Sequence, residues 1–121
     1  MRQLISTGSP WEPKVGYSRA VIVNDTIYIS GTAGKGPDVY AQTQDALDTI
    51  AKVLTDNGFQ LSDVVQSRLI VADFEHWEDA ARAHGEVYSE IRPSFSLVHA
   101  LPFVDDAILV EVEAIAIKAS K

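Results

Sequence analysis

The sequence contains no cysteine, and this absence excludes several kinds of site at once. Without a thiol, the chain has no disulfide, no thiolate nucleophile and no zinc–thiolate centre. The three histidines lack the H-x-x-x-H spacing of a helical metal site, so no metal ion is expected. The chain also lacks a G-K-[ST] phosphate loop and a G-x-S-x-G nucleophile elbow.

Positive charge is scarce. Ten Lys and Arg residues stand against 17 Asp and Glu residues, which gives a formal net charge of -7. Nucleic-acid binding depends on clustered cations that neutralise phosphates, so no nucleic-acid partner is expected. A local patch assembled from scattered basic residues remains an open alternative; the candidates are Arg2, Lys14, Arg19, Lys35 and Arg68.

Long apolar runs are missing too. No segment has the length needed to cross a bilayer, and the first residues, MRQLISTGSP, lack the apolar core of a signal peptide. With 121 residues, 46% of them hydrophobic and 22% charged, the chain is expected to form a single domain over residues 1–121. We expect this domain to be soluble and cytoplasmic, with no membrane association.

Hydrophobic periodicity predicts six strands and two helices. The strands are expected at residues 2–6, 17–23, 26–33, 64–72, 95–101 and 107–117, with Asn24-Asp25 as a hairpin turn. One helix begins after Asp38, with Leu47, Ile50, Ala51 and Leu54 as its apolar stripe, and ends at Asn57-Gly58. The other follows Asp73 as its cap and ends before Pro93, with the stripe Trp77, Ala80, Ala81, His84, Val87, Tyr88 and Ile91.

The segment TGSPWEPKVG contains two prolines and is expected to be irregular. The predicted order is therefore β-β-β-α-β-α-β-β, an α+β fold with two helices on one face of a six-stranded sheet. The strands are too apolar to leave the other face in water, so self-association is expected.

The last predicted strand, AILVEVEAIAI, carries two acids in an apolar run. Successive side chains of a strand alternate between faces, so Glu111 and Glu113 point the same way. An acid in such surroundings is either paired or takes up a proton more readily. Arg19 and Arg68 are the candidate partners. Arg19 is alternatively a binding group, and Glu111 either a structural acid or a catalyst.

Two histidines and one aromatic loop have two interpretations each. His84 lies on the apolar stripe of the second helix, and His99 shares a strand face with Phe95. Each is either a packed core residue or a pocket group. Trp11, with Glu12, either covers a cleft or anchors a loop.

Three segments together resemble the RidA/YjgF family: GYSRAVIVNDTIYISGTA, DALDTIAKVLTDNGFQLSDVVQSRLIVAD and RPSFSLVHALPFVDDAILVEVEAIA. The resemblance covers essentially the whole chain. It implies a chorismate-mutase-like fold assembled as a homotrimer, with three ligand clefts between subunits. It also implies hydrolysis of reactive enamines and imines without a cofactor.

The site residues follow from the same resemblance. Tyr17, Ser30, Gly31 and Glu111 match the family's cleft residues, with Glu111 as the catalytic acid and base. The family's carboxylate-binding arginine, within a P-A-R-S motif, is replaced here by Phe95 in the stretch PSFS. Loss of such a charge-assisted hydrogen bond costs about 1.5 to 3 kcal/mol, or about ten- to a hundredfold in binding. Arg19 and His84 complete the predicted substrate-binding set.

Three functions follow from these residues. The first is a RidA-like hydrolytic deaminase whose substrate is atypical, since Phe95 favours an uncharged or apolar molecule. The second is a protein that binds a small metabolite without catalysis. The third is an RNA-cleaving or translation-inhibiting protein, which the acidic composition disfavours.

Overall fold

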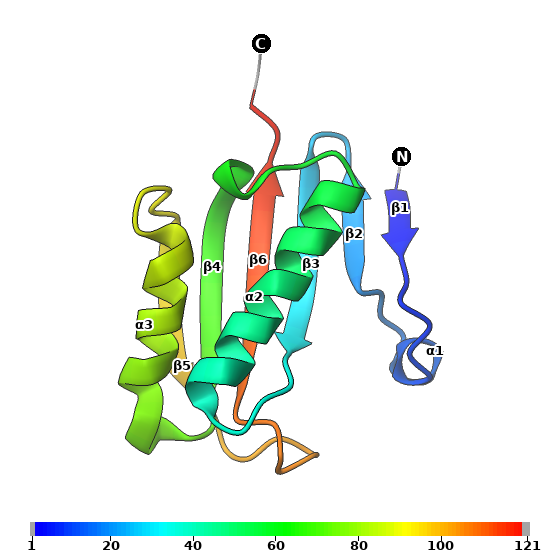
Figure 1. Ribbon diagram of the computed structural model, residues 1–121. Helices are drawn as coiled ribbons and strands as arrows, with labels where there is room; N and C mark the ends of the chain where they lie inside the picture. The colour runs from blue at the N-terminus through cyan, green and yellow to red at the C-terminus, as the bar shows by residue number, and fades with distance from the viewer. Residues whose placement is uncertain (1, 120–121) are drawn as a thin grey trace.

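The computed structural model describes residues 2–119, which form one mixed sheet with helices against one face (Figure 1). Along the sheet the strands run in the order β1-β2-β3-β6-β4-β5, and only β4 and β5 are parallel. The strands are β1 (Arg2–Ile5), β2 (Ala20–Val23), β3 (Thr26–Ala33), β4 (Val64–Val71), β5 (Ser94–His99) and β6 (Val110–Ile117). The predicted six-stranded α+β sheet is confirmed.

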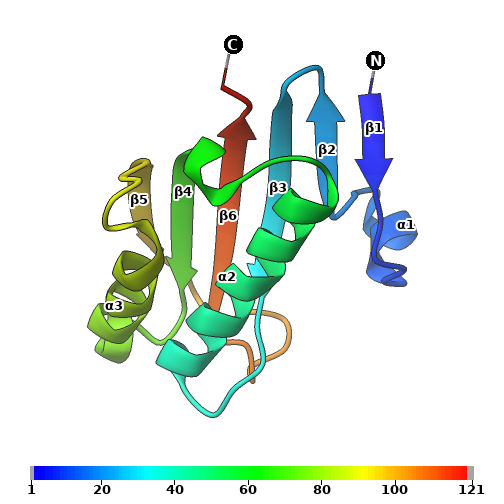
Figure 2. The ribbon, with the colours of Figure 1, turned by 45° about the horizontal axis from the view of Figure 1, so that its top comes forward.

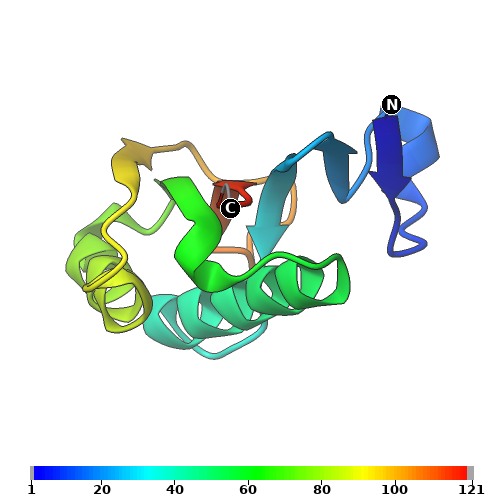
Figure 3. The same ribbon diagram turned by 90° about the horizontal axis from the view of Figure 1, so that it is seen from above.

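Two long helices cover the sheet, α2 (Val39–Asp56) and α3 (Trp77–Tyr88). Figure 2 shows α2 crossing the central strands, and Figure 3 shows α2 and α3 next to each other on one face. A short helix, α1 (Trp11–Val15), lies at the β1 edge, and single 3-10 turns span Leu61–Asp63 and Phe74–His76. Among the helices described, none is long and apolar enough to cross a bilayer.

The local signals of the sequence account for most element ends. Asn24 has a positive φ of 54°, which suits the two-residue turn between β2 and β3. Asp38 caps α2 by accepting a hydrogen bond from the backbone N–H of Ala41 at 2.9 Å. On α2, Leu47, Ile50 and Leu54 are buried, as its apolar stripe predicts.

The central strand β6 divides the molecule into two sides. Val110, Val112 and Ala114 are buried beneath the helices, whereas Glu111 and Glu113 are half-buried on the opposite face. The predicted alternation is therefore confirmed. We refer to the side of the sheet away from α2 and α3 as the open face.

The expectation of an irregular segment around the two prolines was wrong. Trp11–Val15 form one helical turn, with Pro10 at its N-cap and Gly16 at its end with a φ of 91°. Pro13 is the third residue of this turn, where a backbone N–H has no partner within the helix, so the missing donor costs little. Glu12 is buried within this turn, and its burial helps to stabilise the helical conformation of Trp11–Val15.

The predicted cap of the second helix was also wrong. The Asp73 carboxylate lies 2.8 Å from Nδ1 of His76, and a 3-10 turn intervenes before α3 begins at Trp77. Ala83 is buried on α3 where Ala81 was expected. The bounds of most strands differ from the predicted ones by up to three residues: β2 begins at Ala20 and β6 at Val110, whereas β5 begins one residue earlier, at Ser94.

Candidate active site

Glu111 lies near the start of β6, on the open face. In the ladders it stands between Ala33 of β3 and Ile70 of β4. Burial raises the pKa of its carboxyl, Arg19 counteracts the rise, and Glu113 adds to it. Glu111 is therefore a carboxyl that exchanges a proton closer to neutrality than an exposed glutamate does.

A bulge in β3 brings Gly31 against Glu111. Between Ile29 and Thr32 the register shifts, so β3 has one residue more than β6 over this interval. A Cβ at position 31 would lie 2.5 Å from Oε1 of Glu111, closer than real Cβ contacts. Glycine leaves room here for the Glu111 carboxylate, which a side chain at position 31 would displace.

Arg19 is held next to these residues. Its guanidinium donates to the carbonyl oxygen of Gly31 at 2.6 Å, and its Nε is buried without a hydrogen-bond partner. The hydrogen bond from Ser6 is the main cause that lowers the pKa of Glu12, and the charge of Arg19 adds to it; the same charge opposes the rise in the pKa of Glu111 that burial causes. Arg19 therefore acts on two carboxylates while it is anchored to the backbone.

A cavity of about 600 Å³ adjoins Glu111. It lies between α1 and the loop that precedes β6. Its lining residues are Trp11, Val15, Tyr17, Phe103, Val104, Asp105, Ile108 and Glu111. The predicted residues Tyr17 and Glu111 thus line the same cavity.

Ser30 and Tyr17 line an adjoining hollow of about 480 Å³, next to Arg2, Leu4 and Glu12. The Ser30 hydroxyl donates to the carbonyl oxygen of Ser18 at 2.7 Å. Its lone pairs remain available to a donor. Because Tyr17 borders both spaces, it connects Ser30 to the cavity that contains Glu111.

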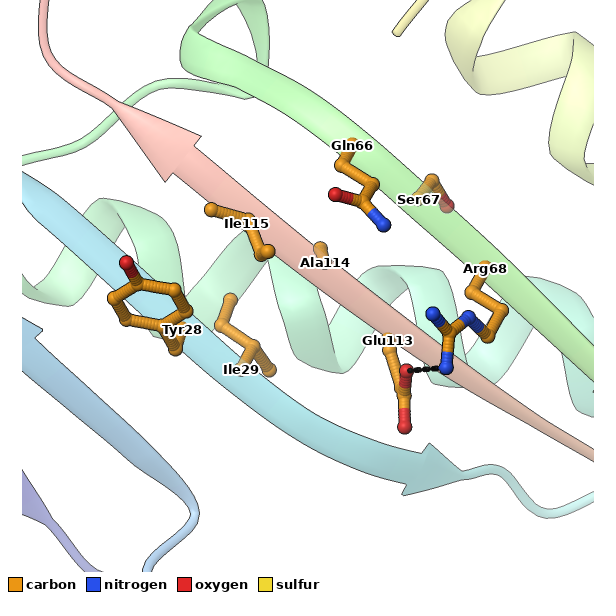
Figure 4. Close-up of a pocket in the computed structure, with 8 residues that line it drawn as sticks. All are labelled: Tyr28, Ile29, Gln66, Ser67, Arg68, Glu113, Ala114 and Ile115. Carbon is orange, nitrogen blue, oxygen red and sulfur yellow. Dashed lines mark ion pairs between the residues drawn. The ribbon is translucent and has the colours of Figure 1, made fainter. Parts of the chain in front are cut away.

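Glu113 has a different environment although it shares the face of Glu111. Its carboxylate lies 3.4 Å from Nη1 of Arg68, and both side chains are about two-fifths exposed. Figure 4 shows the pair pointing toward each other from β6 and β4, in a hollow of about 230 Å³ that Tyr28 and Ile115 also line. Arg68 is thus the partner of Glu113.

His84 and Phe95 lie on the other side of the sheet. His84 is buried on α3, where Nε2 lies 2.9 Å from the Ser67 hydroxyl of β4. The Phe95 ring packs 4.7 Å from the His84 ring, and burial lowers the pKa of His84 to about 4. Within one chain, the structure does not bring these two residues to Glu111.

The sequence reasoning missed two parts of the site. Glu12 was noted only beside Trp11, yet its carboxylate accepts hydrogen bonds from the Ser6 hydroxyl at 2.6 Å and the Thr7 hydroxyl at 3.0 Å. These bonds fix the turn that presents Trp11 and Tyr17. Phe103 and Val104, from the loop before β6, also line the cavity; the signal was the apolar residues in this loop.

Within residues 2–119, no group of three or more His, Asp or Glu side chains is placed to hold a metal ion. The polar side chains that line the cavity are the carboxyl of Glu111, whose pKa is raised, the carboxyl of Asp105 and the phenol of Tyr17.

Comparisons with known proteins identify the family of the chain. The sequence profile of the family described as Endoribonuclease L-PSP matches residues 7–118. An uncharacterized protein of Streptomyces coelicolor is 31% identical over 124 residues, which cover 96% of this chain and 92% of that protein. The 2-iminobutanoate/2-iminopropanoate deaminase of Capra hircus is 30% identical over 128 residues, covering 98% and 91% of the two chains.

A solved structure extends the likeness to three dimensions. The crystal structure of a Mycobacterium tuberculosis protein, described as a member of the YjgF/YER057c/UK114 family, superposes with a TM-score of 0.92. It is 39% identical, and the match covers 98% of this chain and all of that one. The fold is the chorismate-mutase-like fold of this group. The chain therefore belongs to the Endoribonuclease L-PSP family, which is also called the YjgF/RidA family.

Proposed function

We propose that the protein is a cofactor-free hydrolase of small, reactive imines or enamines, with Glu111 as the group that transfers protons. The observation that carries this proposal is the position of Glu111: it borders a cavity of ligand size, and burial raises its pKa. The deaminase relatives support the reaction class, because they are named for 2-iminobutanoate and 2-iminopropanoate.

The reaction has two steps at one carbon. Water attacks the imine carbon while the Glu111 carboxylate accepts a proton from it, and the electron pair of the C=N bond moves to nitrogen. Glu111 then returns this proton to nitrogen, which gives a carbinolamine with one hydroxyl and one amino group. Glu111 next accepts the hydroxyl proton and passes it to the amino nitrogen, so that the C=O bond forms, the C–N bond breaks and ammonia leaves. A carboxyl with a raised pKa is suited to both transfers. Tyr17 and the backbone near Gly31 position the substrate or the water.

The proposal includes a homotrimer with the clefts between its subunits. On the open face, Tyr28 is 50% exposed and Ile117 44% exposed, which is unusual for apolar side chains at the centre of a sheet. The cavity wall is also open to solvent, since Val104 is fully exposed and Trp11 more than half exposed. A neighbouring copy would cover these groups. In such a trimer, His84 and Phe95 would act on the substrate from α3 and the edge strand β5 of a neighbouring copy.

Phe95 makes the substrate atypical within this proposal. An arginine at this position would bind a substrate carboxylate through two hydrogen bonds, and an apolar ring makes neither. Phe95 instead packs on His84. We therefore expect weak binding of 2-iminopropanoate compared with an imine that has no carboxylate.

Ammonia release tests the proposal. The wild-type protein is incubated with freshly generated 2-iminopropanoate and with imines of simple aldehydes, and Glu111→Gln and Glu113→Gln are compared. Glu113 is the matched control, since it lies on the same strand face but is paired with Arg68. We expect Glu111→Gln to lose at least a hundredfold in kcat/KM and Glu113→Gln to lose little. Equal activity of Glu111→Gln and wild type would refute the role of Glu111.

The same experiment separates the alternatives. A protein that only binds a metabolite would release no ammonia, yet a ligand would raise its unfolding temperature. A Phe95→Arg variant that gains activity on 2-iminopropanoate would show that only the carboxylate contact was missing. RNA cleavage, which the family description mentions, requires RNA binding that weakens steeply with salt. The net charge of -7 disfavours that outcome.

A further inference from the structure

The cavity beside Glu111 has an unusual combination of linings. The lining has three aromatic residues (Trp11, Tyr17 and Phe103), two acidic residues (Asp105 and Glu111) and three aliphatic residues (Val15, Val104 and Ile108). Among these lining residues none carries a positive charge. Aromatic faces and carboxylates both attract cations, so the lining as a whole favours a positively charged ligand.

The nearest cations are already engaged elsewhere. Arg19 is anchored to the carbonyl of Gly31 and shares its charge between Glu12 and Glu111, and it does not line the cavity. Lys14 lies with its ammonium 5.6 Å from the centre of the Trp11 ring. This contact shows that the indole face accepts a cation. Neither residue is placed to hold a substrate carboxylate in this cavity.

The two carboxylates come from different segments. Asp105 lies in the loop before β6 and uses one oxygen to accept the backbone N–H of Ala107 at 2.9 Å, which leaves its second oxygen free of that bond. Glu111 lies on β6, next to the space that a side chain at Gly31 would occupy. Both acids line one cavity together with the aromatic rings.

We propose that the ligand of this cavity is an organic cation without a carboxylate, namely a protonated imine or its amine counterpart. This inference rests on the proposed function for the reaction but not for the binding. The nitrogen lies toward Glu111 and Asp105, and the carbon skeleton packs on the aromatic rings. In hydrolysis, the iminium R₂C=NH₂⁺ and water give R₂C=O and NH₄⁺, so the charge leaves with the ammonium ion.

Three ligands that share a cyclohexane ring test which sign of ligand charge the cavity prefers. Cyclohexylammonium, cyclohexanol and cyclohexanecarboxylate are titrated by calorimetry at low salt and neutral pH, where the amine is protonated. We expect cyclohexylammonium to bind at least tenfold more tightly than cyclohexanol, and the carboxylate to bind most weakly. Similar affinity of the three, or tighter binding of the carboxylate, would overturn the inference.

Variants assign the effect to the cavity. Glu111→Gln and Asp105→Asn are each expected to weaken cyclohexylammonium binding about three- to tenfold while leaving cyclohexanol binding unchanged. Asp106→Asn is the control, because Asp106 lies in the same loop but does not line the cavity. Equal losses in Asp105→Asn and Asp106→Asn would indicate only the general negative charge and would refute the site.

The outcomes separate this inference from the proposed function. Hydrolysis of 2-iminopropanoate that depends on Glu111, with no preference for cyclohexylammonium, would leave the enzyme in place and overturn the cation site. Charge-selective binding without ammonia release from any imine would support the cation site and refute the hydrolase.

Discussion

Gly31→Ala is the substitution that tests the geometry of the site most directly. The added Cβ would lie 2.5 Å from Oε1 of Glu111 and 3.5 Å from Cδ of the same side chain. Only the oxygen contact is prohibitive, so the carboxylate must rotate or move by about 1 Å. The Gly31 backbone lies in an extended strand, where alanine has no conformational difficulty.

These distances give a specific expectation. Because the clash is with the end of a side chain, the free energy of unfolding should change by less than about 1 kcal/mol. A catalytic group displaced by about 1 Å typically costs about a hundredfold in rate. Gly31→Ala should therefore fold normally and lose about a hundredfold in kcat/KM for imine hydrolysis.

The assay is ammonia release, with urea unfolding measured on the same preparations. Gly85→Ala is the matched control, because a Cβ at this position of α3 meets nothing within 4 Å. That variant should keep its activity and gain up to about 1 kcal/mol in stability. If Gly31→Ala retains wild-type activity, Glu111 does not act from the position described, and the argument for its role fails.

Three further predictions concern stability and assembly. Burial holds the pKa of His84 at about 4 in the folded chain against 6.5 in the unfolded chain, so the stability this residue contributes is lost as pH falls from about 6.5 to about 4. Urea unfolding of wild type should thus weaken over this range by up to about 3 kcal/mol more than that of His84→Gln; parallel pH profiles would contradict the assignment. Tyr28→Asp places a charge on the open face and should yield monomers in light scattering, whereas Gln44→Asp on the exposed side of α2 should not; a monomeric wild type would instead refute the trimer. Glu12→Ala removes the acceptor of the Ser6 and Thr7 hydroxyls, so backbone amides of residues 9–17 should exchange with deuterium faster while those of β6 stay protected; unchanged exchange would show that Glu12 does not fix the turn.

Periodicity predicted the fold well because burial follows it strictly here. On β6 the residues Val110, Val112 and Ala114 are buried and the glutamates between them are not. The hairpin at Asn24 was predicted just as directly, because its turn needs a residue that tolerates a positive φ. These are local rules, and they hold wherever one face of an element is covered.

The parts that failed depend on specific contacts between side chains. The α1 turn is ordered by the hydrogen bonds of Glu12 to Ser6 and Thr7, and proline content alone pointed the other way. Asp73 was a good cap by sequence, but His76 competes for its carboxylate. In both cases a side chain bonds to a partner that secondary-structure propensity does not predict.

The site itself was predictable only in part. Glu111 and Tyr17 came from the resemblance, and the structure places them around one cavity. The β3 bulge that brings Gly31 against Glu111 has no sequence signal beyond the glycine, because a bulge is set by the register of two strands. The position of Phe95 on the helix side required knowing that β5 is parallel to β4 and that His84 lies over Ser67.

Glu111 and Glu113 show how one strand face can provide both a structural and a reactive acid. Glu113 lies 3.4 Å from the Arg68 guanidinium, at a partly exposed site where the two side chains form an ion pair. Glu111 is the more desolvated, and its arginine is drawn toward the Gly31 carbonyl and shared with Glu12. Burial is the main cause of the raised pKa of Glu111, and the charge of Arg19 opposes it. Replacing Arg19 with Gln should therefore raise the pKa of Glu111 further, which carboxyl titration by NMR would measure directly; an unchanged pKa of Glu111 would contradict this role of Arg19.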